Sequence, residues 1–262
     1  MSNKLFWTLS PEGKEILRDL EEEGKSFNMD DYHKGIYDGN NYQWQEMFNH
    51  FIYDDIGCDY ERYGCYIKEG DVVLDLGGNI GVFAHRAETR GASKVISFEP
   101  VTPTFNCLIK NAGPKTVVYK NAVGGKHGFT TFSIHTDFTH IGGGSSEDQD
   151  LLLNQRSIVH SERVIIIGIN EIFENMDTKF DFMKIDIEGG EVEVLTSITD
   201  KNLASLRCLS AEFHRSYEEF DIFQEQFVQR MNNLGFRSFV LYHGDGKLRT
   251  LNFWKEWKES VL

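Results

Sequence analysis

The sequence has little positive charge, few cysteines and no long apolar run. Its 262 residues include 27 lysines and arginines against 41 aspartates and glutamates, which gives a formal net charge of −14. A chain with this balance repels a phosphate backbone unless basic residues gather locally, and no run of five or more basic residues occurs. No stretch approaches the roughly 20 apolar residues that cross a bilayer. We therefore expect neither a nucleic acid nor a membrane as a partner.

Cysteine usage points to a reducing compartment. The four cysteines, Cys58, Cys65, Cys107 and Cys208, are scattered without CxxC spacing. This spacing argues against a zinc site and against a disulfide framework. The first ten residues also lack the basic patch and apolar stretch of a secretory signal. We expect a soluble, cytoplasmic protein, and its oligomeric state stays open.

The chain changes in character near residue 66. Residues 1–66 are rich in aromatic and acidic side chains, with helix signals at Ser10–Glu12 and Trp44–Phe51. We predict that they form a helical cap, which either packs on the sheet or closes over a substrate. Residues 67–262 alternate strand-like and helical segments, and two final strand-like runs flank the turn His243–Gly246. This order predicts an α/β domain with a mostly parallel sheet that ends in an antiparallel hairpin.

The strongest functional signal is the loop Asp75–Gly81. It follows a short apolar run and precedes a helical segment, an arrangement with which α/β sheets bind nucleotides. Its glycines, Gly77, Gly78 and Gly81, would let the backbone approach a ligand closely. Glu99 ends the next strand roughly 20 residues further on, where a carboxylate can accept both ribose hydroxyls. A glycine turn without any ligand is the simpler alternative.

Two features of this loop favour S-adenosylmethionine over a nicotinamide cofactor. A dinucleotide loop of the pattern GxGxxG requires glycine at position 76, where this chain has Leu76. Asp75 suits the ammonium group of a methionine moiety, whereas it would repel a pyrophosphate. A nicotinamide-dependent oxidoreductase and a non-catalytic Rossmann-like binding module remain as alternatives, since a fold does not determine a function.

A second group of candidates follows the fourth and fifth predicted strands. Asp186 ends the fourth strand, directly across the expected switch in strand order, and Glu188 follows it closely. Glu191 is explained more simply as an acid in the first turn of a helix. His214 near its ordinary pKa suits a catalytic base at neutral pH, and Glu212 would line the same crevice. A Mg²⁺ ion held by Asp186 and Glu212, or a purely structural His214, are the alternatives.

Several stretches resemble the FkbM-type methyltransferases over about residues 67–240: VVLDLGGNIGVFAHRA, SKVISFEP, KNAVGG, IGGGSS, DFMKIDIEGGEVEVL and LSAEFH. The resemblance implies a Rossmann-like class I methyltransferase fold with a seven-stranded sheet. It also implies methyl transfer from S-adenosylmethionine, most often to a hydroxyl oxygen of a sugar or polyketide. The implied cofactor-binding residues are Asp75, Gly77, Gly78, Asn79, Gly81, Glu99, Asn121 and Ala122. The implied residues on the acceptor side are Asp186, Glu188 and His214.

The combined prediction is an S-adenosylmethionine-dependent O-methyltransferase. The acceptor would be a small molecule or glycan, with a sugar preferred to a lipid-like or polyketide-like alcohol because the cap is rich in aromatics. Asp186 or His214 would take the acceptor's proton, and the segment His140–Ser146 would close as a lid. We expect no bound metal, with Mg²⁺ as the less favoured possibility.

Overall fold

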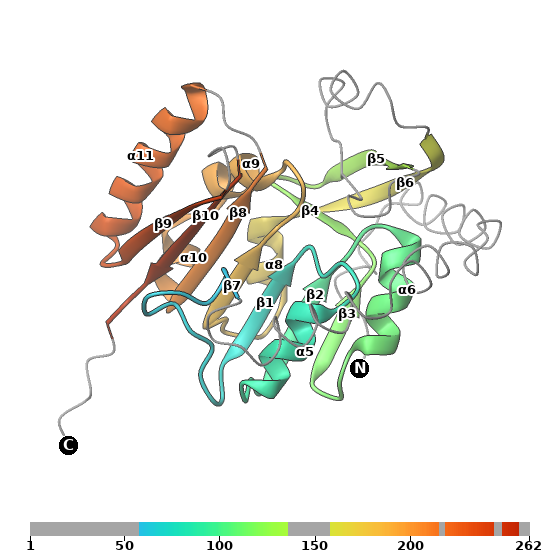
Figure 1. The fold of residues 1–262 in the computed structure, drawn as a ribbon, viewed down its shortest axis with the longest axis horizontal. Coiled ribbons are helices and arrows are strands. Elements are labelled where there is room, and N and C mark those ends of the chain that lie inside the picture. Colours follow the sequence, from blue (N-terminus) through green and yellow to red (C-terminus); the bar gives the residue numbers. More distant parts are fainter. Residues whose placement is uncertain (1–57, 136–157, 215–217, 244–247, 257–262) are drawn as a thin grey trace.

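The computed structural model describes residues 58–135, 158–214, 218–243 and 248–256 (Figure 1). Most of the predicted helical cap, the predicted lid His140–Ser146 and nearly all of the hairpin turn lie outside the described residues. The part of the chain that carries the predicted site is described almost throughout.

A seven-stranded sheet forms the centre of the fold, in the order β3-β2-β1-β7-β8-β10-β9. Its strands are β1 (Val72–Leu76), β2 (Lys94–Phe98), β3 (Thr116–Tyr119), β7 (Phe182–Ile185), β8 (Cys208–Phe213), β9 (Arg237–His243) and β10 (Leu248–Trp254). β1 pairs in parallel with both β2 and β7, so the strand order switches beside β1, as predicted. β9 and β10 form the predicted antiparallel hairpin, and β10 inserts between β8 and β9.

Helices cover both faces of this sheet. They are α5 (Val82–Thr89), α6 (Thr102–Asn111), α8 (Ile169–Asn175), α9 (Glu191–Ser197), α10 (Asp200–Ser205) and α11 (Glu218–Asn233). Successive strand residues enter different cores: Val73 packs with Phe83 of α5, whereas Leu74 belongs to the core that holds α8 to α11. This alternation follows from the two-residue period of a strand and produces three layers, helix on sheet on helix. Figure 1 shows α5 in front of the sheet and α8 and α10 behind it.

A separate three-stranded sheet interrupts the α/β order. It consists of β4 (Ala122–Gly124), β5 (Gly128–His135) and β6 (Ile158–Gly168), with β6 in the middle. β6 is parallel to β4 and antiparallel to β5. Figure 1 shows this sheet beyond the arrowheads of β1 and β2, so it lies over the edge at which the predicted site residues emerge. The residues Phe129–Ile134 are of types common in strands, but they give no sign that this strand would face the site.

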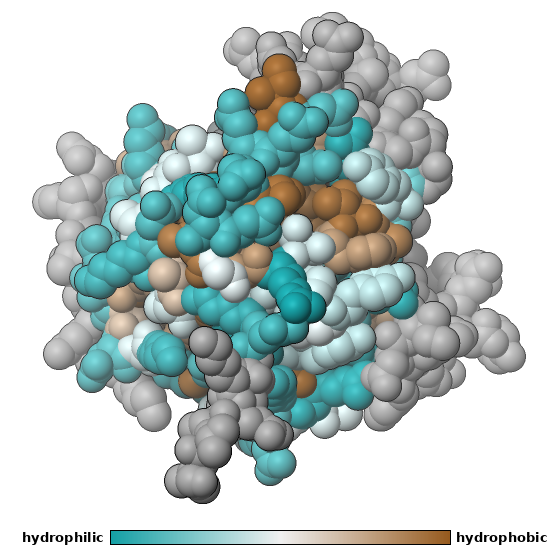
Figure 2. Space-filling model, turned by 90° about the vertical axis from the view of Figure 1, so that its left-hand side faces the viewer, coloured by the Kyte–Doolittle hydropathy of each residue, from teal (hydrophilic) through white to brown (hydrophobic). Residues whose placement is uncertain are grey.

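The surface seen from the side of α11 is mainly hydrophilic, with hydrophobic side chains in small patches (Figure 2). Within the described ranges, no helix has both the length and the apolar character that crossing a membrane requires.

Candidate functional site

Glycines bring the loop after β1 into contact with the end of β7. Gly77 has φ +83°, and a Cβ at this position would lie 1.7 Å from the carbonyl oxygen of Asp186. A Cβ on Gly78 would lie 2.2 Å from Ser97 Oγ. Only glycine fits these two positions without moving the neighbouring strands, because such separations are far below van der Waals contact. The close approach of Gly77 therefore fixes the distance between this loop and Asp186 at the end of β7.

The backbone N–H groups of this loop are used inside the protein. Those of Gly77 and Gly78 both donate to the carbonyl oxygen of Phe98, at 3.0 and 2.8 Å. The N–H of Asn79 donates to Glu99 Oε2 at 2.9 Å. The sequence predicts that this loop binds a nucleotide-like cofactor, but these three N–H groups already have acceptors within the protein. A phosphate would find no free N–H there, so the loop suits a ligand that has no phosphate group.

Glu99 is a buried carboxylate held by three donors. Its oxygens accept hydrogen bonds from the N–H of Asn79, from the N–H of Val101 at 3.0 Å and from Thr104 Oγ1 at 2.7 Å. Burial raises the pKa of Glu99 to about 7, although these hydrogen bonds act in the opposite direction. The carboxyl group is thus fixed in orientation and changes charge close to neutral pH.

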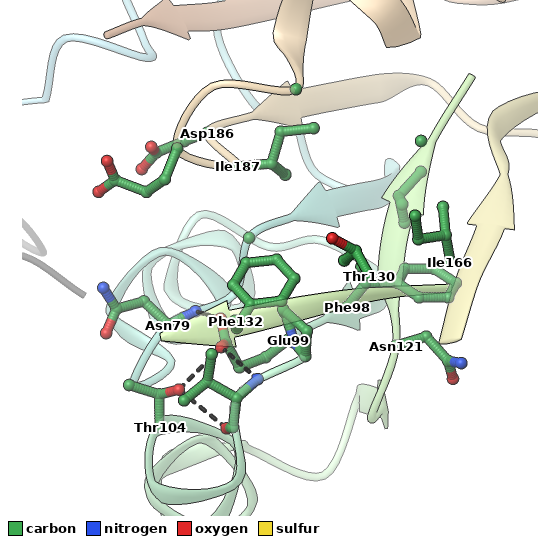
Figure 3. A pocket seen from close by; sticks show the side chains of 18 of the residues that line it. Asn79, Phe98, Glu99, Thr104, Asn121, Thr130, Phe132, Ile166, Asp186 and Ile187 are labelled. Carbon is green, nitrogen blue, oxygen red and sulfur yellow. Dashed lines mark hydrogen bonds between the residues drawn. The ribbon is translucent and has the colours of Figure 1, made fainter. Parts of the chain in front are cut away.

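Glu99 and Asp186 line the same pocket, which has about 830 Å³ of empty space including its open mouth (Figure 3). Figure 3 shows Glu99 and Thr104 on one side and Asp186 on the other. The predicted site residues in its lining are Gly77, Asn79, Glu99, Asn121, Ala122, Asp186 and Glu188. The second sheet adds a wall that the sequence did not reveal: Thr130, Phe132 and Ile166.

Four predicted residues lie outside the lining: Asp75, Gly78, Gly81 and His214. The carboxylate of Asp75 is fully buried, accepts a hydrogen bond from Ser97 Oγ at 2.7 Å and lies 3.4 Å from Lys184 Nζ. Lys184, which the sequence reasoning missed, donates to the carbonyl oxygen of Gly77 at 2.6 Å and lies 3.4 Å from Asp186 Oδ2. Asp75 therefore acts on the pocket through Lys184, and a direct contact with a methionine ammonium stays a prediction.

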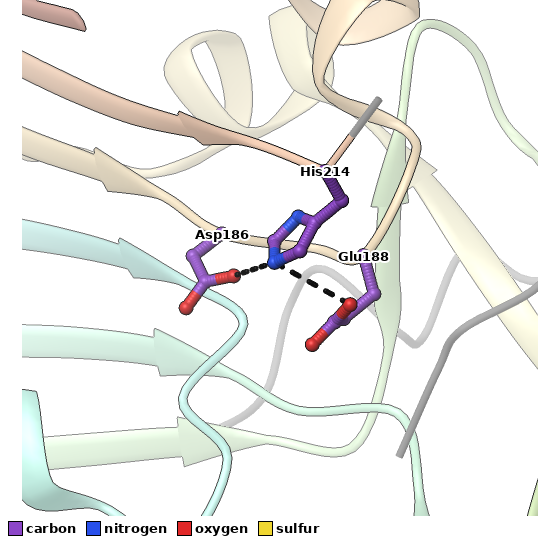
Figure 4. A group of neighbouring side chains, drawn as sticks. All are labelled: Asp186, Glu188 and His214. Atoms are coloured by element: carbon purple, nitrogen blue, oxygen red, sulfur yellow. Dashed lines mark ion pairs between the residues drawn. The ribbon is translucent and has the colours of Figure 1, made fainter. Parts of the chain in front are cut away.

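His214 lies at the centre of a group of carboxylates (Figure 4). Its Nε2 is 3.5 Å from Asp186 Oδ1 and 3.4 Å from Glu188 Oε2, and its Nδ1 is 3.3 Å from Glu191 Oε1. Burial disfavours the charged ring, but Glu191, Glu188 and Asp186 outweigh it and raise the pKa of His214 to about 10. The expectation of an ordinary His214 pKa is therefore wrong, and the ring is an imidazolium at neutral pH.

The carboxylates around this imidazolium differ from one another. Burial opposes ionisation of Asp186, but Lys184 and His214 lower its pKa below the ordinary value. Burial raises the pKa of Glu188 to about 7, and the backbone of this residue is left-handed, with φ +57°. Asp186 is therefore the carboxylate that is charged throughout the neutral range and lines the pocket.

Glu191 orders the turn that presents Asp186 and Glu188. It is the first residue of α9 and is buried, and its Oε1 accepts from the N–H of Gly189 at 2.9 Å and of Ile187 at 3.2 Å. These contacts favour the structural explanation of Glu191 over a catalytic one.

Asp186, Glu188 and His214 are the described residues whose spacing best suits a metal ion, since one donor atom from each lies within 4.8 Å of the others. Both ring nitrogens of His214 face carboxylates, so the ring carries two protons and has no lone pair to offer. A cation would first have to displace a proton. The absence of a metal stays a prediction.

Comparison with known proteins identifies the family. Residues 75–238 match the family model described as the methyltransferase FkbM domain. The chain is 28% identical over 192 residues to the 31-O-demethyl-FK506 methyltransferase FkbM of Streptomyces tacrolimicus, covering 63% of this chain and 74% of that protein. It is 29% identical over 161 residues to the hexuronic acid methyltransferase AglP of Haloferax volcanii, covering 59% of this chain and 61% of that protein.

Among solved structures, a methyltransferase FkbM from Methylobacillus flagellatus is similar, with a TM-score of 0.47 and 16% identity over 78% of this chain. This chain spans about half of that protein, 47% of its length. The family model alone covers more than half of the present sequence. This chain belongs to the FkbM methyltransferase domain family.

Proposed function

We propose that this chain transfers the methyl group of S-adenosylmethionine to a hydroxyl oxygen of a neutral, sugar-like molecule. The observation that carries the proposal is one pocket with two different ends. Glu99, held by three donors, lies at one end, and the ionised Asp186 beside the His214 imidazolium lies at the other. The family assignment favours this function over nicotinamide chemistry.

The first end fits an adenosyl group. The ionised Glu99 offers oxygens to ribose hydroxyls, and Asn121 with Ala122 lines the adjoining part of the pocket, where an adenine would lie. The loop donors are already used by Phe98 and Glu99, which supports a cofactor without phosphate. When bound, S-adenosylmethionine supplies a methyl group made electrophilic by its sulfonium.

The second end fits a hydroxyl acceptor. Asp186 lines the pocket, and Lys184 and His214 hold its carboxylate in the charged form from either side. It accepts the hydroxyl proton as the acceptor oxygen bonds to the methyl carbon and the carbon–sulfur electron pair stays on sulfur. The base need not be strong, because most of the acceleration comes from alignment of the oxygen with the methyl carbon. His214 orients Asp186 and balances its charge.

The acceptor class follows from charge and from the relatives. Asp186, Glu188 and Glu193 all line the pocket and would repel an anionic group beside the reacting oxygen. A neutral sugar or glycan hydroxyl avoids this repulsion. The names of the two relatives, a 31-O-demethyl-FK506 methyltransferase and a hexuronic acid methyltransferase, support an oxygen-bearing small molecule or glycan. Because a hexuronic acid is an anion, the neutrality of the acceptor rests on the charge of the pocket alone. The acidic surface of the pocket also supports the prediction that nucleic acid is not a substrate.

The proposal is tested by calorimetry followed by a transfer assay. S-adenosylmethionine and S-adenosylhomocysteine are expected to bind, and NAD is not. At 100 times Kd, binding adds about 2.7 kcal/mol to the free energy of unfolding, which raises Tm by several degrees at this size. Radiolabelled methyl transfer is then measured with neutral glycosides, hexuronic acids and polyketide alcohols. Binding of NAD alone, or transfer only to the acids, would contradict the proposal.

Asp186→Asn separates binding from chemistry. The amide keeps the shape of the side chain but cannot accept the proton, so kcat should fall by about 10²- to 10⁴-fold. The Kd of S-adenosylmethionine should stay within a few-fold, because Glu99 and the loop are unchanged. Wild-type turnover by the variant would remove Asp186 from the mechanism.

A further inference from the structure

A tyrosine that precedes the family-matched residues reaches the acceptor end of the pocket. Tyr60 is buried, with its ring packed edge-on against Phe83, at 5.6 Å between centroids. Lys184 Nζ lies 5.2 Å from the centroid of the same ring. The phenol is therefore held between a helix and a buried cation, and its hydroxyl group has a defined direction.

That hydroxyl group contacts two carboxylates. Tyr60 Oη lies 2.7 Å from Asp186 Oδ2, and it also makes a short hydrogen bond with Glu212 Oε2. A phenol has one proton and can donate it to one of these oxygens. The second contact needs another proton, which must lie on a carboxyl group, because two ionised carboxylates cannot share one donor at such distances without strong repulsion.

Of the two carboxyl groups, Glu212 is the better suited to carry the second proton. Burial and the charge of Asp186 raise the pKa of Glu212, whereas Lys184 and His214 lower that of Asp186. The distances to the two cations agree with this difference in pKa. Asp186 Oδ2 is 3.4 Å from Lys184 Nζ, and its Oδ1 is 3.5 Å from His214 Nε2. Glu212 approaches His214 only to 3.9 Å. With a proton on Glu212, both contacts are satisfied: Glu212 would donate to Tyr60, and Tyr60 would donate to Asp186.

We propose that Tyr60 relays protons between Asp186 and Glu212, so that Glu212 is the exit for the proton taken from the acceptor. This assignment rests on the proposed methyl transfer. Asp186 lines the pocket, so a bound acceptor covers its direct route to water. Glu212 does not line the pocket and keeps a side-chain exposure of 18%. Asp186 is 23% exposed and faces the pocket, whereas the 18% of Glu212 lies outside the pocket lining, so the relay would connect the carboxylate that an acceptor covers to one that it does not.

The relay balances in protons. The acceptor's hydroxyl proton passes to Asp186 as the methyl group is transferred, and Glu212 releases its own proton to solvent. The Tyr60 hydroxyl then turns toward the ionised Glu212. A concerted shift moves the Asp186 proton to Tyr60 and the phenol proton to Glu212, which restores the starting state. One proton leaves for each methyl group transferred.

The charged groups around the relay come from four elements of the fold. Lys184 belongs to β7, Glu191 opens α9, and His214 follows β8. Glu188 lies in the turn before α9, and Asp75 of β1 reaches the group through Lys184. Any pH dependence of the relay reflects all five groups, so the test compares variants and does not interpret one titration alone.

The test follows the carboxyl groups directly in the ligand-free protein. Asp and Glu are labelled with carbon-13 at their side-chain carboxyl carbons, and their NMR shifts are recorded against pH in the presence of a chelator. Glu212→Gln and Asp186→Asn assign the two signals. At neutral pH, Glu212 is expected to be protonated and Asp186 ionised. Tyr60→Phe is expected to raise the Asp186 midpoint by about one to two pH units, because a donor to the charged form is lost.

Tyr63→Phe is the matched control. Tyr63 lies three residues further along, is 59% exposed and packs its ring on Phe239, so loss of its hydroxyl should leave both carboxyl titrations unchanged. Ionised Glu212 at neutral pH, or an Asp186 midpoint that does not move in Tyr60→Phe, would overturn the relay. The titration needs no cofactor or acceptor, so its outcome is independent of the test of methyl transfer.

Discussion

The two ends of the pocket are built in different ways. At the Glu99 end, a single carboxylate is held by two backbone N–H groups and one hydroxyl. The donors are Asn79 in the loop after β1 and Val101 and Thr104 at the start of α6. At the Asp186 end, eight titratable side chains come from residues spread between 60 and 214. One end is a cradle of uncharged donors around one carboxylate, and the other is a network of charges.

This difference predicts different responses to mutation. Loss of one hydrogen bond in the cradle removes that bond and little else. In a network of buried charges, each group sets the protonation of its neighbours, so single changes are expected to be non-additive. The cradle suits recognition of one unchanging cofactor, whereas the network suits an end at which a proton must be received and released.

Gly77→Ala should have the largest effect, because Gly77 joins the two ends. A Cβ there would lie 1.7 Å from the Asp186 carbonyl oxygen, and φ is +83°. The loop must move away from β7, which breaks the contact of Lys184 with Gly77 and displaces Asp186. We expect a loss of about 3 kcal/mol or more in the free energy of unfolding and no measurable binding of S-adenosylmethionine, by thermal unfolding and calorimetry.

Gly128→Ala is its control. Gly128 begins β5, and a Cβ there would meet no atom within 4 Å. Stability and cofactor binding should stay close to wild type. Equal losses in the two variants would show that the close approach of Gly77 to Asp186 is not what matters.

His214→Gln tests the charged end through the pH dependence of stability. The folded pKa of His214 is about 10, above the unfolded value of about 6.5. Its stabilising contribution is therefore complete below pH 6.5 and is lost as the pH rises through 10. Across this window the free energy of unfolding of the wild type should fall by at most a few kcal/mol more than that of the variant. The measurement is Tm against pH for both proteins, and the wild-type Tm should fall further.

His127→Gln controls for loss of a histidine. His127 pairs with Glu171 at 3.4 Å, but both side chains are 40% exposed, and such surface pairs contribute about 0–1 kcal/mol. Its Tm profile should follow that of wild type. If His214→Gln also follows wild type up to pH 10, the imidazolium is not stabilised by its carboxylates.

The sequence predicted Glu99 at one end and Asp186, Glu188 and His214 at the other, but it did not predict the contacts of Tyr60 and Lys184 that link the network. Asp75–Gly81 and Glu99 follow adjacent parallel strands, and a strand-loop-helix signal is local. Tyr60, in contrast, meets Asp186 across 126 positions, and its position in the chain shows no pattern that would indicate this contact. The pKa of His214 was expected to be ordinary because it depends on how many carboxylates the fold gathers around the ring, and spacing along the chain does not contain that information.

The position of the second sheet could not be predicted from the sequence either. The residues of β5 include aromatic and β-branched types common in strands, but β4 has only three residues, Ala122–Gly124, too few for a period to be recognised. The contribution of Phe132 to the pocket depends on that sheet lying across the strand ends, which is a tertiary feature. Asn121 and Ala122 were predicted from resemblance alone, and both line the pocket.

Glu99→Gln should have the smallest effect, and it tests whether the cradle acts alone. Burial raises the pKa of Glu99 to about 7, and the ionised form is the one that accepts ribose hydroxyls. Wild-type affinity for S-adenosylmethionine one pH unit below this pKa should therefore be about tenfold lower than the affinity at high pH, where Glu99 is fully ionised. The amide should bind more weakly by about 1–2 kcal/mol and show no such slope. Glu174→Gln, on the exposed side of α8, should keep both the affinity and the slope. If Glu99→Gln keeps the slope, the titration belongs to the charged end, and the two ends of the pocket are coupled through Lys184.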